Sequence, residues 1–297
     1  MTDPARSPIE EVMDLLDLEK IEENIFRGQS PEDRMQRVFG GQVLGQALVA
    51  ASRTVEGRVC HSFHAYFLRA GDPKIPILYE VDRARDGASF TSRRVIAIQH
   101  GKQIFNMSAS FQVPEKGLEH QFDMPKVPPP EQLMDEHEAR KKWMENAPED
   151  AKAWMSRPRP IEMRPVILDD WMNRKAREPF DNVWIRATGP VPDNVIVQQS
   201  VLAYASDMSL LDTALLPHGR SWQSPIQMAS LDHAMWFHHP FKMDDWLLYA
   251  QDSPSASGAR GFNRGALYTR DGKLVASVVQ EGLMRPREPQ KDSKKKA

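Results

Sequence analysis

Residues 39–52 read FGGQVLGQALVAAS, a turn with two glycines followed by a run of mostly apolar residues. The apolar side chains between Val43 and Ala51 recur three and four positions apart, which predicts a helix over residues 43–52. Because this run is rich in Ala and Gly, other backbone can approach it closely. A strongly curved antiparallel sheet can bury one such helix along its concave face.

Four strand-like runs follow the predicted helix. They cover residues 62–68, 75–85, 91–99 and 102–112, and Gly87 and His100-Gly101 supply turns between the later ones. Short strands joined by tight turns predict an antiparallel sheet next to the helix.

The middle of the chain has a different character. Residues 128–130 are three prolines, and a charged stretch extends over residues 135–150. This composition predicts a linker over residues 114–160 with one exposed helix at 131–146. After Pro165 the first pattern returns, with a strand at 183–187, a helix at 195–216, and strands at 226–237, 246–253, 259–268 and 273–284.

Three short matches align the two halves of the chain. They pair His64-Ala65 with His233-Ala234, Leu78-Tyr79 with Leu248-Tyr249, and Gly101-Lys102 with Gly272-Lys273. The offset stays close to about 170 residues, as an internal duplication requires. A helix followed by four antiparallel strands, present twice, predicts the α+β class and a tandem (double) hotdog fold, with two antiparallel sheets each wrapped around a central helix.

The duplication also predicts where the domains begin and end. We expect an N-terminal hotdog domain over residues 1–113, the linker over 114–160, a C-terminal hotdog domain over 161–287, and a polar disordered tail over 288–297.

The composition excludes several classes of function. With 39 basic and 41 acidic residues, a net charge of -2 and no basic stripe before the tail, the chain is not expected to bind nucleic acid. No apolar run approaches the roughly 20 residues that span a bilayer, and the first residues lack the layout of a secretory signal. Cys60 is the single cysteine, which fits a reducing compartment. Since the chain does not end in Ser-Lys-Leu, we expect a cytoplasmic protein.

Several long strings in both halves resemble one known family. They are LEKIEE at 18–23, FRGQ at 26–29, FGGQV at 39–43, FLRAGDP at 67–73, LDHAMWFH at 231–238 and VQEG at 279–282. These strings look like those of acyl-CoA thioesterase II, and the similarity extends over most of the chain outside the first dozen residues, the linker and the tail.

This resemblance implies an enzyme that hydrolyses fatty acyl-CoA to free acid and CoA. The family's water-activating Asp, Thr or Ser, and Gln fall on Asp207, Ser230 and Gln280, with serine here where relatives have threonine. The resemblance implies no cofactor, because CoA is part of the substrate. It also implies a homodimer or homotetramer, which exposed sheet edges would favour.

The chemistry of thioester hydrolysis agrees with these three residue types. Without a metal, a carboxylate is the plausible base, and the apolar neighbours of Asp207 on its predicted helix would raise its pKa. Ser230 and Gln280 are polar residues in apolar strands and need hydrogen-bond partners if buried. Taken alone, each has an ordinary structural explanation: a helix-surface carboxylate, a serine bonded to backbone, and a solvent-facing glutamine. Gln280 aligns with Ala109, so only the second half has the full polar set.

Other residues are weaker candidates for contacts with the thioester oxyanion and with the CoA phosphates. Backbone N–H groups of Gly41 or Gln42, where the first helix begins, suit an oxyanion, although a tight turn explains the glycines equally well. Arg93, Arg260 and Arg264 lie on late strands and could meet CoA phosphates, with a solvated strand face as the alternative. Histidines three apart on a strand point to opposite faces, so no metal site is expected.

Two alternatives remain open at the level of sequence. Hotdog folds also host enoyl-CoA hydratases, so fold alone does not separate the two chemistries. A hydratase would pair a carboxylate with a histidine in one short motif, whereas the set here is Asp, Ser and Gln. The other alternative is a non-catalytic acyl-CoA binding protein.

Overall fold

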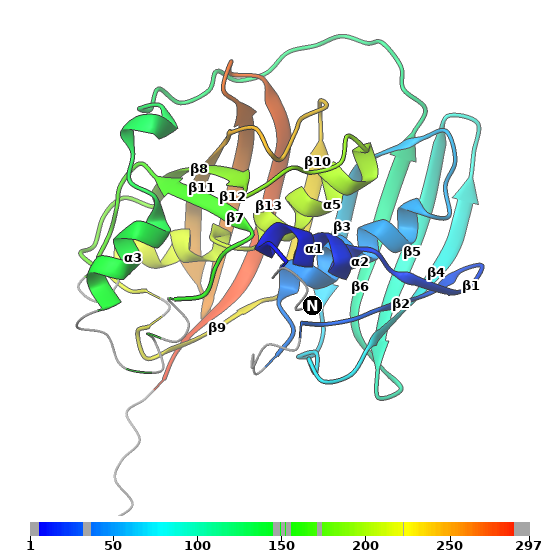
Figure 1. The fold of residues 1–297 in the computed structure, drawn as a ribbon, viewed down its shortest axis with the longest axis horizontal. Coiled ribbons are helices and arrows are strands. Elements are labelled where there is room, and N and C mark those ends of the chain that lie inside the picture. Colours follow the sequence, from blue (N-terminus) through cyan, green and yellow to red (C-terminus); the bar gives the residue numbers. More distant parts are fainter. Residues whose placement is uncertain are drawn as a thin grey trace, which may run out of the picture.

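The computed structural model describes residues 6–31, 37–144, 149, 152, 156–170, 174–221 and 223–287. Thirteen strands form one continuous sheet in the order β1-β2-β4-β5-β6-β3-β10-β13-β12-β11-β8-β7, with β9 paired to β13 beside this path. The sheet curves around two central helices (Figure 1). The predicted disordered tail lies outside the described residues.

Each half of the chain contributes one helix and one half of the sheet. In the N-terminal half these are α2 (Gly40–Ser52), β1 (Glu19–Glu22), β2 (Ile25–Gly28), β3 (Val59–Phe67), β4 (Ile77–Asp86), β5 (Phe90–Gln99) and β6 (Lys102–Gln112). In the C-terminal half they are α5 (Val195–Ser206), β7 (Ile161–Pro165), β8 (Phe180–Ala187), β9 (Ile226–Ser230), β10 (Asp232–Phe237), β11 (Leu247–Ser257), β12 (Arg260–Thr269) and β13 (Leu274–Pro286). This arrangement confirms the predicted α+β class and the tandem hotdog fold.

The two halves join where β3 pairs antiparallel with β10. His64 lies opposite Ala234, and Ala65 lies opposite His233. His64 is exposed whereas His233 is fully buried, so the sequence alignment of these two histidines was wrong by one residue. A shift of one residue moves a strand side chain to the other face of the sheet. Phe63, which is buried, therefore corresponds to His233, and the two rings stack with centroids 6.2 Å apart.

Helices α2 and α5 pack directly on each other in the middle of the molecule. Glycines of α2 allow this approach: a Cβ on Gly41 would lie 2.3 Å from the carbonyl oxygen of Tyr204, and one on Gly45 would lie 3.0 Å from that of Ser200. Side chains larger than hydrogen would push the two helices apart. Helix α1 (Pro8–Leu16) covers both, burying its apolar face against them (Figure 1).

Two predicted elements of the C-terminal half are divided in the structure. The helix predicted over 195–216 ends at Ser206, and a separate 3-10 helix, η2 (Leu210–His218), follows. Asp207 therefore caps the end of α5 instead of lying within a helix, as the sequence had suggested. The strand predicted over 226–237 is divided at Leu231 into β9 and β10, both paired with β13.

The linker is packed against the C-terminal half of the sheet. Its extended part passes over one end of the molecule (Figure 1), and Met124 and Val127 contact a buried cluster that includes Trp184. The Trp184 indole Nε1–H donates to the Pro128 carbonyl at 2.9 Å. A 3-10 turn, η1 (Pro130–Gln132), precedes α3 (Glu136–Met144), which begins five residues later than predicted and packs beside β7 with Ala139 buried.

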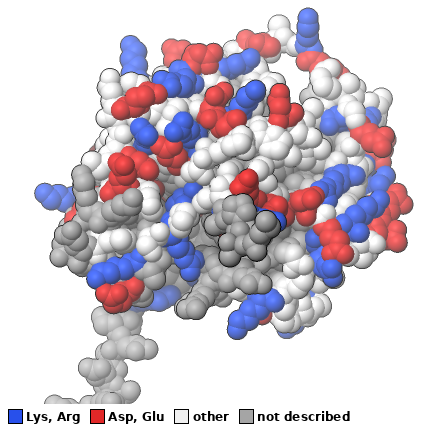
Figure 2. All heavy atoms as spheres, viewed as in Figure 1, with Lys and Arg blue, Asp and Glu red and all other residues white. Residues whose placement is uncertain are grey.

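The visible surface has charges of both signs interspersed over its elements (Figure 2). Among the helices that the structure describes, none is long and apolar enough to cross a membrane.

The close approach of α2 and α5 leads to a prediction about stability. We expect Gly41→Ala to cost about 1–3 kcal/mol, because the new methyl group meets a backbone carbonyl that has no room to move. Thermal unfolding of the variant measures the loss. Gly117→Ala is the matched control, since a Cβ there meets nothing within 4 Å. Equal Tm values for the two variants would contradict the packing described here.

Candidate active site

Asp207, Ser230 and Gln280 come together at one carboxyl oxygen. Ser230 Oγ donates to Asp207 Oδ1 at 3.0 Å, and Gln280 Nε2 donates to the same oxygen at 2.6 Å. The three residues lie at the end of α5, at the end of β9 and within β13. Two local features bring these three residues into contact: the break between α5 and η2, and the end of β9 at Ser230.

The surroundings of Asp207 favour its protonated form more than water does. Burial of the carboxyl raises its pKa to about 6, although hydrogen bonds from Gln280, Ser230 and the Gly41 backbone each act to lower it. A carboxylate with this pKa is mostly ionised at neutral pH and still accepts a proton readily, as a general base must.

The N-terminal half supplies the other side of this contact. The N–H of Gly41, in the first turn of α2, donates to the Asp207 carboxyl. A Cβ on Gly40 would lie 2.5 Å from Asp207 Oδ2. Position 40 must therefore be glycine, because any side chain there would collide with the Asp207 carboxyl. The sequence pattern identified the neighbours Gly41 and Gln42 as candidates, but not Gly40. The Gly41 N–H thus faces the Asp207 carboxyl and helps to hold its pKa down, and the oxyanion role predicted for Gly41 or Gln42 stays a prediction.

Gln42 has a structural contact away from the carboxyl. Its buried side chain donates from Nε2 to the Gln29 carbonyl and to Ser30 Oγ, both at 3.0 Å. Gln42 is also absent from the wall of the cavity that contains Asp207. Its side chain therefore fixes the loop before α2.

Asp207 and Ser230 line a cavity of about 580 Å³ between the two halves. The apolar part of its wall includes Val43, Phe67 and Ile104 from the N-terminal half and Met208, Leu211 and Met228 from the C-terminal half. Gln280 is fully buried and holds Asp207 from behind, outside the cavity wall. The cavity presents a carboxyl and a hydroxyl at an apolar wall, which is suited to an ester or thioester with a hydrophobic acyl group.

The arginines predicted to bind phosphate lie elsewhere. Arg93 is 2% exposed, and its guanidinium bonds Thr54 and Asp86, so the structure contradicts a phosphate-binding role. Arg260 pairs with Glu281 and Arg264 with Asp252, each at 2.9 Å, and neither lines the cavity. Strand alternation explains the error for Arg93, because one residue of shift decides whether a side chain faces the core.

His233 is the histidine nearest in sequence to the polar set, yet it is bonded elsewhere. Its Nε2 lies 2.9 Å from Ser206 Oγ, which itself donates to the Ala203 carbonyl. Burial lowers the pKa of His233 to about 3, so the ring is neutral. Asn263 is another buried polar residue that sequence reasoning missed; it lies opposite Gln280 across β12 and β13.

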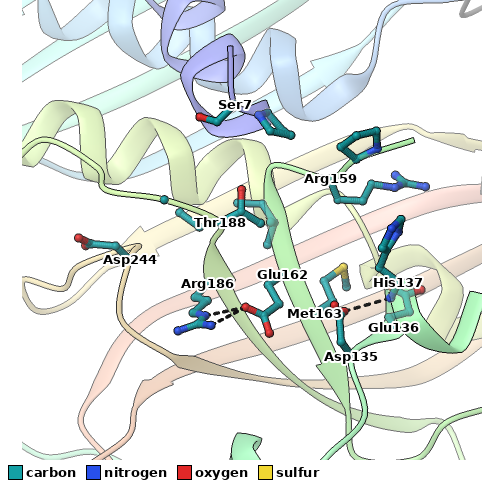
Figure 3. Close-up of a pocket in the computed structure, with 15 residues that line it drawn as sticks. Ser7, Asp135, Glu136, His137, Arg159, Glu162, Met163, Arg186, Thr188 and Asp244 are labelled. Atoms are coloured by element: carbon teal, nitrogen blue, oxygen red, sulfur yellow. Dashed lines mark hydrogen bonds and ion pairs between the residues drawn. The ribbon is translucent and has the colours of Figure 1, made fainter. Parts of the chain in front are cut away.

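A second cavity, of about 550 Å³, lies between α1, α3 and β7 (Figure 3). Two of the residues that line it, Glu162 and Arg186, form an ion pair at 2.7 Å, which the close-up shows as dashed lines. None of the predicted site residues lines it. In the part of the chain that the structure describes, no cluster of three or more His, Cys, Asp or Glu side chains could hold a metal ion.

Two family models match the chain, one in each half. A model described as acyl-CoA thioesterase matches residues 152–283, and one described as acyl-CoA thioesterase N-terminal domain matches residues 30–112. The fold and the matches together define a thioester hydrolase with a double hotdog. The chain belongs to the acyl-CoA thioesterase II family, and is an acyl-CoA thioesterase.

Individual relatives agree over nearly their full lengths. Acyl-coenzyme A thioesterase 8 of Homo sapiens is 43% identical over 293 residues, covering 95% of this chain and 91% of the relative. Acyl-CoA thioesterase 2 of Haemophilus influenzae is 42% identical over 273 residues, covering 91% and 96%. The crystal structure of acyl-CoA thioesterase II TesB2 from Mycobacterium marinum is 42% identical, with a TM-score of 0.77 over 93% of this chain and 99% of that one. A hot dog fold protein from Alicyclobacillus acidocaldarius, 19% identical with a TM-score of 0.73 over 94% of this chain and 99% of that one, supports the fold alone.

The contact between Gly40 and Asp207 predicts a loss of activity. Gly40→Ala would place a methyl group 2.5 Å from Asp207 Oδ2 and close to the Phe67 ring, so the carboxyl must move. We expect kcat to fall by about tenfold or more with a smaller change in KM, because small displacements of a base slow the chemical step strongly. Steady-state kinetics measures this, with Gly117→Ala as the control. A variant with wild-type kcat would show that the position of the carboxyl is not critical.

The raised pKa of Asp207 also predicts how stability changes with pH. The Asp207 carboxyl binds its proton more tightly in the folded protein than in the unfolded chain, where the pKa of Asp is about 3.9. The free energy of unfolding of wild type therefore falls as pH rises from about 4 to about 6. Asp207→Asn removes this dependence. Relative to wild type, the variant should therefore gain about 2–3 kcal/mol across that window and no more above it. Calorimetric unfolding at a series of pH values, with Asp193→Asn as control, measures the difference; a difference that stays constant with pH would contradict the raised pKa.

Proposed function

We propose that the chain hydrolyses fatty acyl-CoA with a water molecule that Asp207 activates as general base. The observation that supports this most directly is the convergence of Ser230 and Gln280 on Asp207 Oδ1 at the wall of an apolar cavity. The named substrate of the relatives, acyl-coenzyme A, agrees with this cavity.

The reaction divides into two steps. Asp207 takes a proton from water as the water oxygen forms a bond to the thioester carbonyl carbon, which gives a tetrahedral intermediate. The carbon–sulfur bond then breaks, and the proton held by Asp207 passes to the departing sulfur. The products are the free acid and the CoA thiol, and the carboxylate is restored for the next turnover.

We assign Ser230 and Gln280 different parts in this reaction. Ser230 lines the cavity, so its hydroxyl is placed to bind the water molecule as well as Asp207. Gln280 is fully buried and bonds Asp207 Oδ1 from behind, so it fixes the direction of the carboxyl. Gly41 N–H has the same orienting effect from the opposite half. A base held by three donors loses little time in unproductive orientations.

The oligomeric state, the domain limits and the location remain proposals. We infer a homodimer or homotetramer, because β1 and β7 end the sheet with unpaired edges in the described chain. We also keep the predicted domain limits, 1–113 and 161–287, and the cytoplasmic location as proposals. One relative of Saccharomyces cerevisiae, 25% identical over 83% of this chain and 85% of its own length, is named a peroxisomal acyl-coenzyme A thioester hydrolase, so a peroxisomal location is the outcome to test against.

The hydrolase and its alternatives are separated by Asp207→Asn. We expect wild type to release CoA thiol from acyl-CoA and the variant to lose about 10²–10⁴-fold in kcat, the usual contribution of a general base. Thiol release measured over a range of acyl chain lengths also identifies the preferred acyl group. Asp193→Asn, an exposed carboxyl on the loop before α5, is the matched control.

The pH profile provides a second check of the same assignment. Because the base must be ionised, kcat/KM should fall about tenfold per pH unit below pH 6 and level off above it. Binding of acyl-CoA without thiol release would favour the binding protein, and hydration of an enoyl-CoA would favour the hydratase. A hydratase would also need a carboxylate–histidine pair, whereas His233 is bonded to Ser206.

A further inference from the structure

Two arginines outside the predicted set line the cavity that contains Asp207. Arg37 precedes α2, and Arg69 follows β3; both side chains are exposed. They are the cationic residues of this cavity wall. Neither forms an ion pair within the described chain, in contrast to Arg260 and Arg264.

A backbone hydrogen bond joins the segments that carry the two arginines. The N–H of Val38 donates to the Gly71 carbonyl at 3.0 Å, which joins the segment after Arg37 to the segment after Arg69. Arg69 Nη1 donates to the Gln103 carbonyl at 2.6 Å, which fixes this guanidinium while its other N–H groups remain available. An arginine anchored in this way loses less conformational entropy when it binds a ligand.

The charges on the cavity wall are divided between its two sides. Arg37 and Arg69 belong to the N-terminal half, and the carboxylates Asp207 and Asp212 belong to the C-terminal half. A ligand with several negative charges is attracted to the arginine side and repelled from the carboxylate side.

We infer that Arg37 and Arg69 bind the phosphate groups of the CoA part of the substrate. This inference rests on the proposed function, since it concerns the other end of the molecule whose thioester lies at Asp207. It places the phosphates at the N-terminal half of the cavity rim. The acyl chain then lies on the apolar wall opposite, formed by Met208, Leu211 and Met228.

The test compares two thioesters with the same acyl group. One is acyl-CoA and the other is the acyl thioester of N-acetylcysteamine, which has the same reacting bond and no phosphate. We expect Arg37→Gln and Arg69→Gln each to lower kcat/KM for acyl-CoA about tenfold, mainly through KM, as loss of a charge-assisted hydrogen bond to phosphate predicts. Both variants should cleave the N-acetylcysteamine thioester within about twofold of wild type.

The matched control is Arg94→Gln, an exposed arginine on β5 outside the cavity wall. It should change neither substrate's kinetics. Equal losses on both thioesters in the Arg37 and Arg69 variants would show a structural effect and overturn the inference, as would an unchanged KM for acyl-CoA. A thioester of 3′-dephospho-CoA distinguishes the two kinds of phosphate: a variant that is still impaired on it has lost a contact to the pyrophosphate.

Binding of free CoA separates this inference from the proposed reaction. Calorimetry should show a Kd for CoA that is about tenfold weaker in each variant, and this measurement requires no hydrolysis. If CoA binds through both arginines while wild type releases no thiol, the hydrolytic role of Asp207 fails and the phosphate site stands. If thiol release depends on Asp207 while CoA binding is indifferent to both arginines, the phosphate site fails alone.

Discussion

The contact between the start of α2 and the end of α5 is the interaction on which the rest of the structure depends. Asp207 at the end of α5 accepts the N–H of Gly41, and only a glycine at position 40 leaves room for its carboxyl. An ionised carboxylate is stabilised at the positive end of a helix, which offsets part of the cost of its burial. The pairing of β3 with β10 fixes the two halves in register, so this contact forms only in the joined molecule.

Pseudo-symmetry explains why one such site exists and not two. In the C-terminal half, the interior pair Asn263–Gln280 lies across β12 and β13, and Gln280 bonds the end of α5. The corresponding pair of the N-terminal half is Arg93–Ala109 across β5 and β6. Here Arg93 fills the interior and bonds Thr54, just beyond the end of α2, at 2.8 Å. The N-terminal half therefore has an ion pair between Arg93 and Asp86 where the C-terminal half has Gln280 bonded to Asp207.

The sequence predicted most of the helix and strand pattern and the duplication, and the family resemblance pointed to Asp207 and to the two residues, Ser230 and Gln280, that bond it. These follow from periodicity and from strings of residues that keep their order. The prediction from sequence failed where a shift of one position decides which face of the sheet a side chain lies on. His64 and His233 are each followed by an alanine but face opposite sides of the sheet, and Arg93 is buried where its charge suggested exposure. The role of Gly40 depends on a carboxyl 167 positions away in the chain (207 − 40), which no local pattern encodes.

The joined fold divides recognition and chemistry between the halves. The base and its hydroxyl partner come from the C-terminal half, and the glycines that position the base, together with the two rim arginines, come from the N-terminal half. A substrate with a negatively charged end suits a cavity whose arginines lie on one side and whose carboxylates lie on the other. Two identical copies of a helix wrapped by a sheet would give two equivalent walls, but the halves differ at Arg93 and Gln280 and in the charged residues of the cavity wall. In the proposed mechanism one carboxyl suffices, because a thioester that lies across the two halves needs a base on one side only.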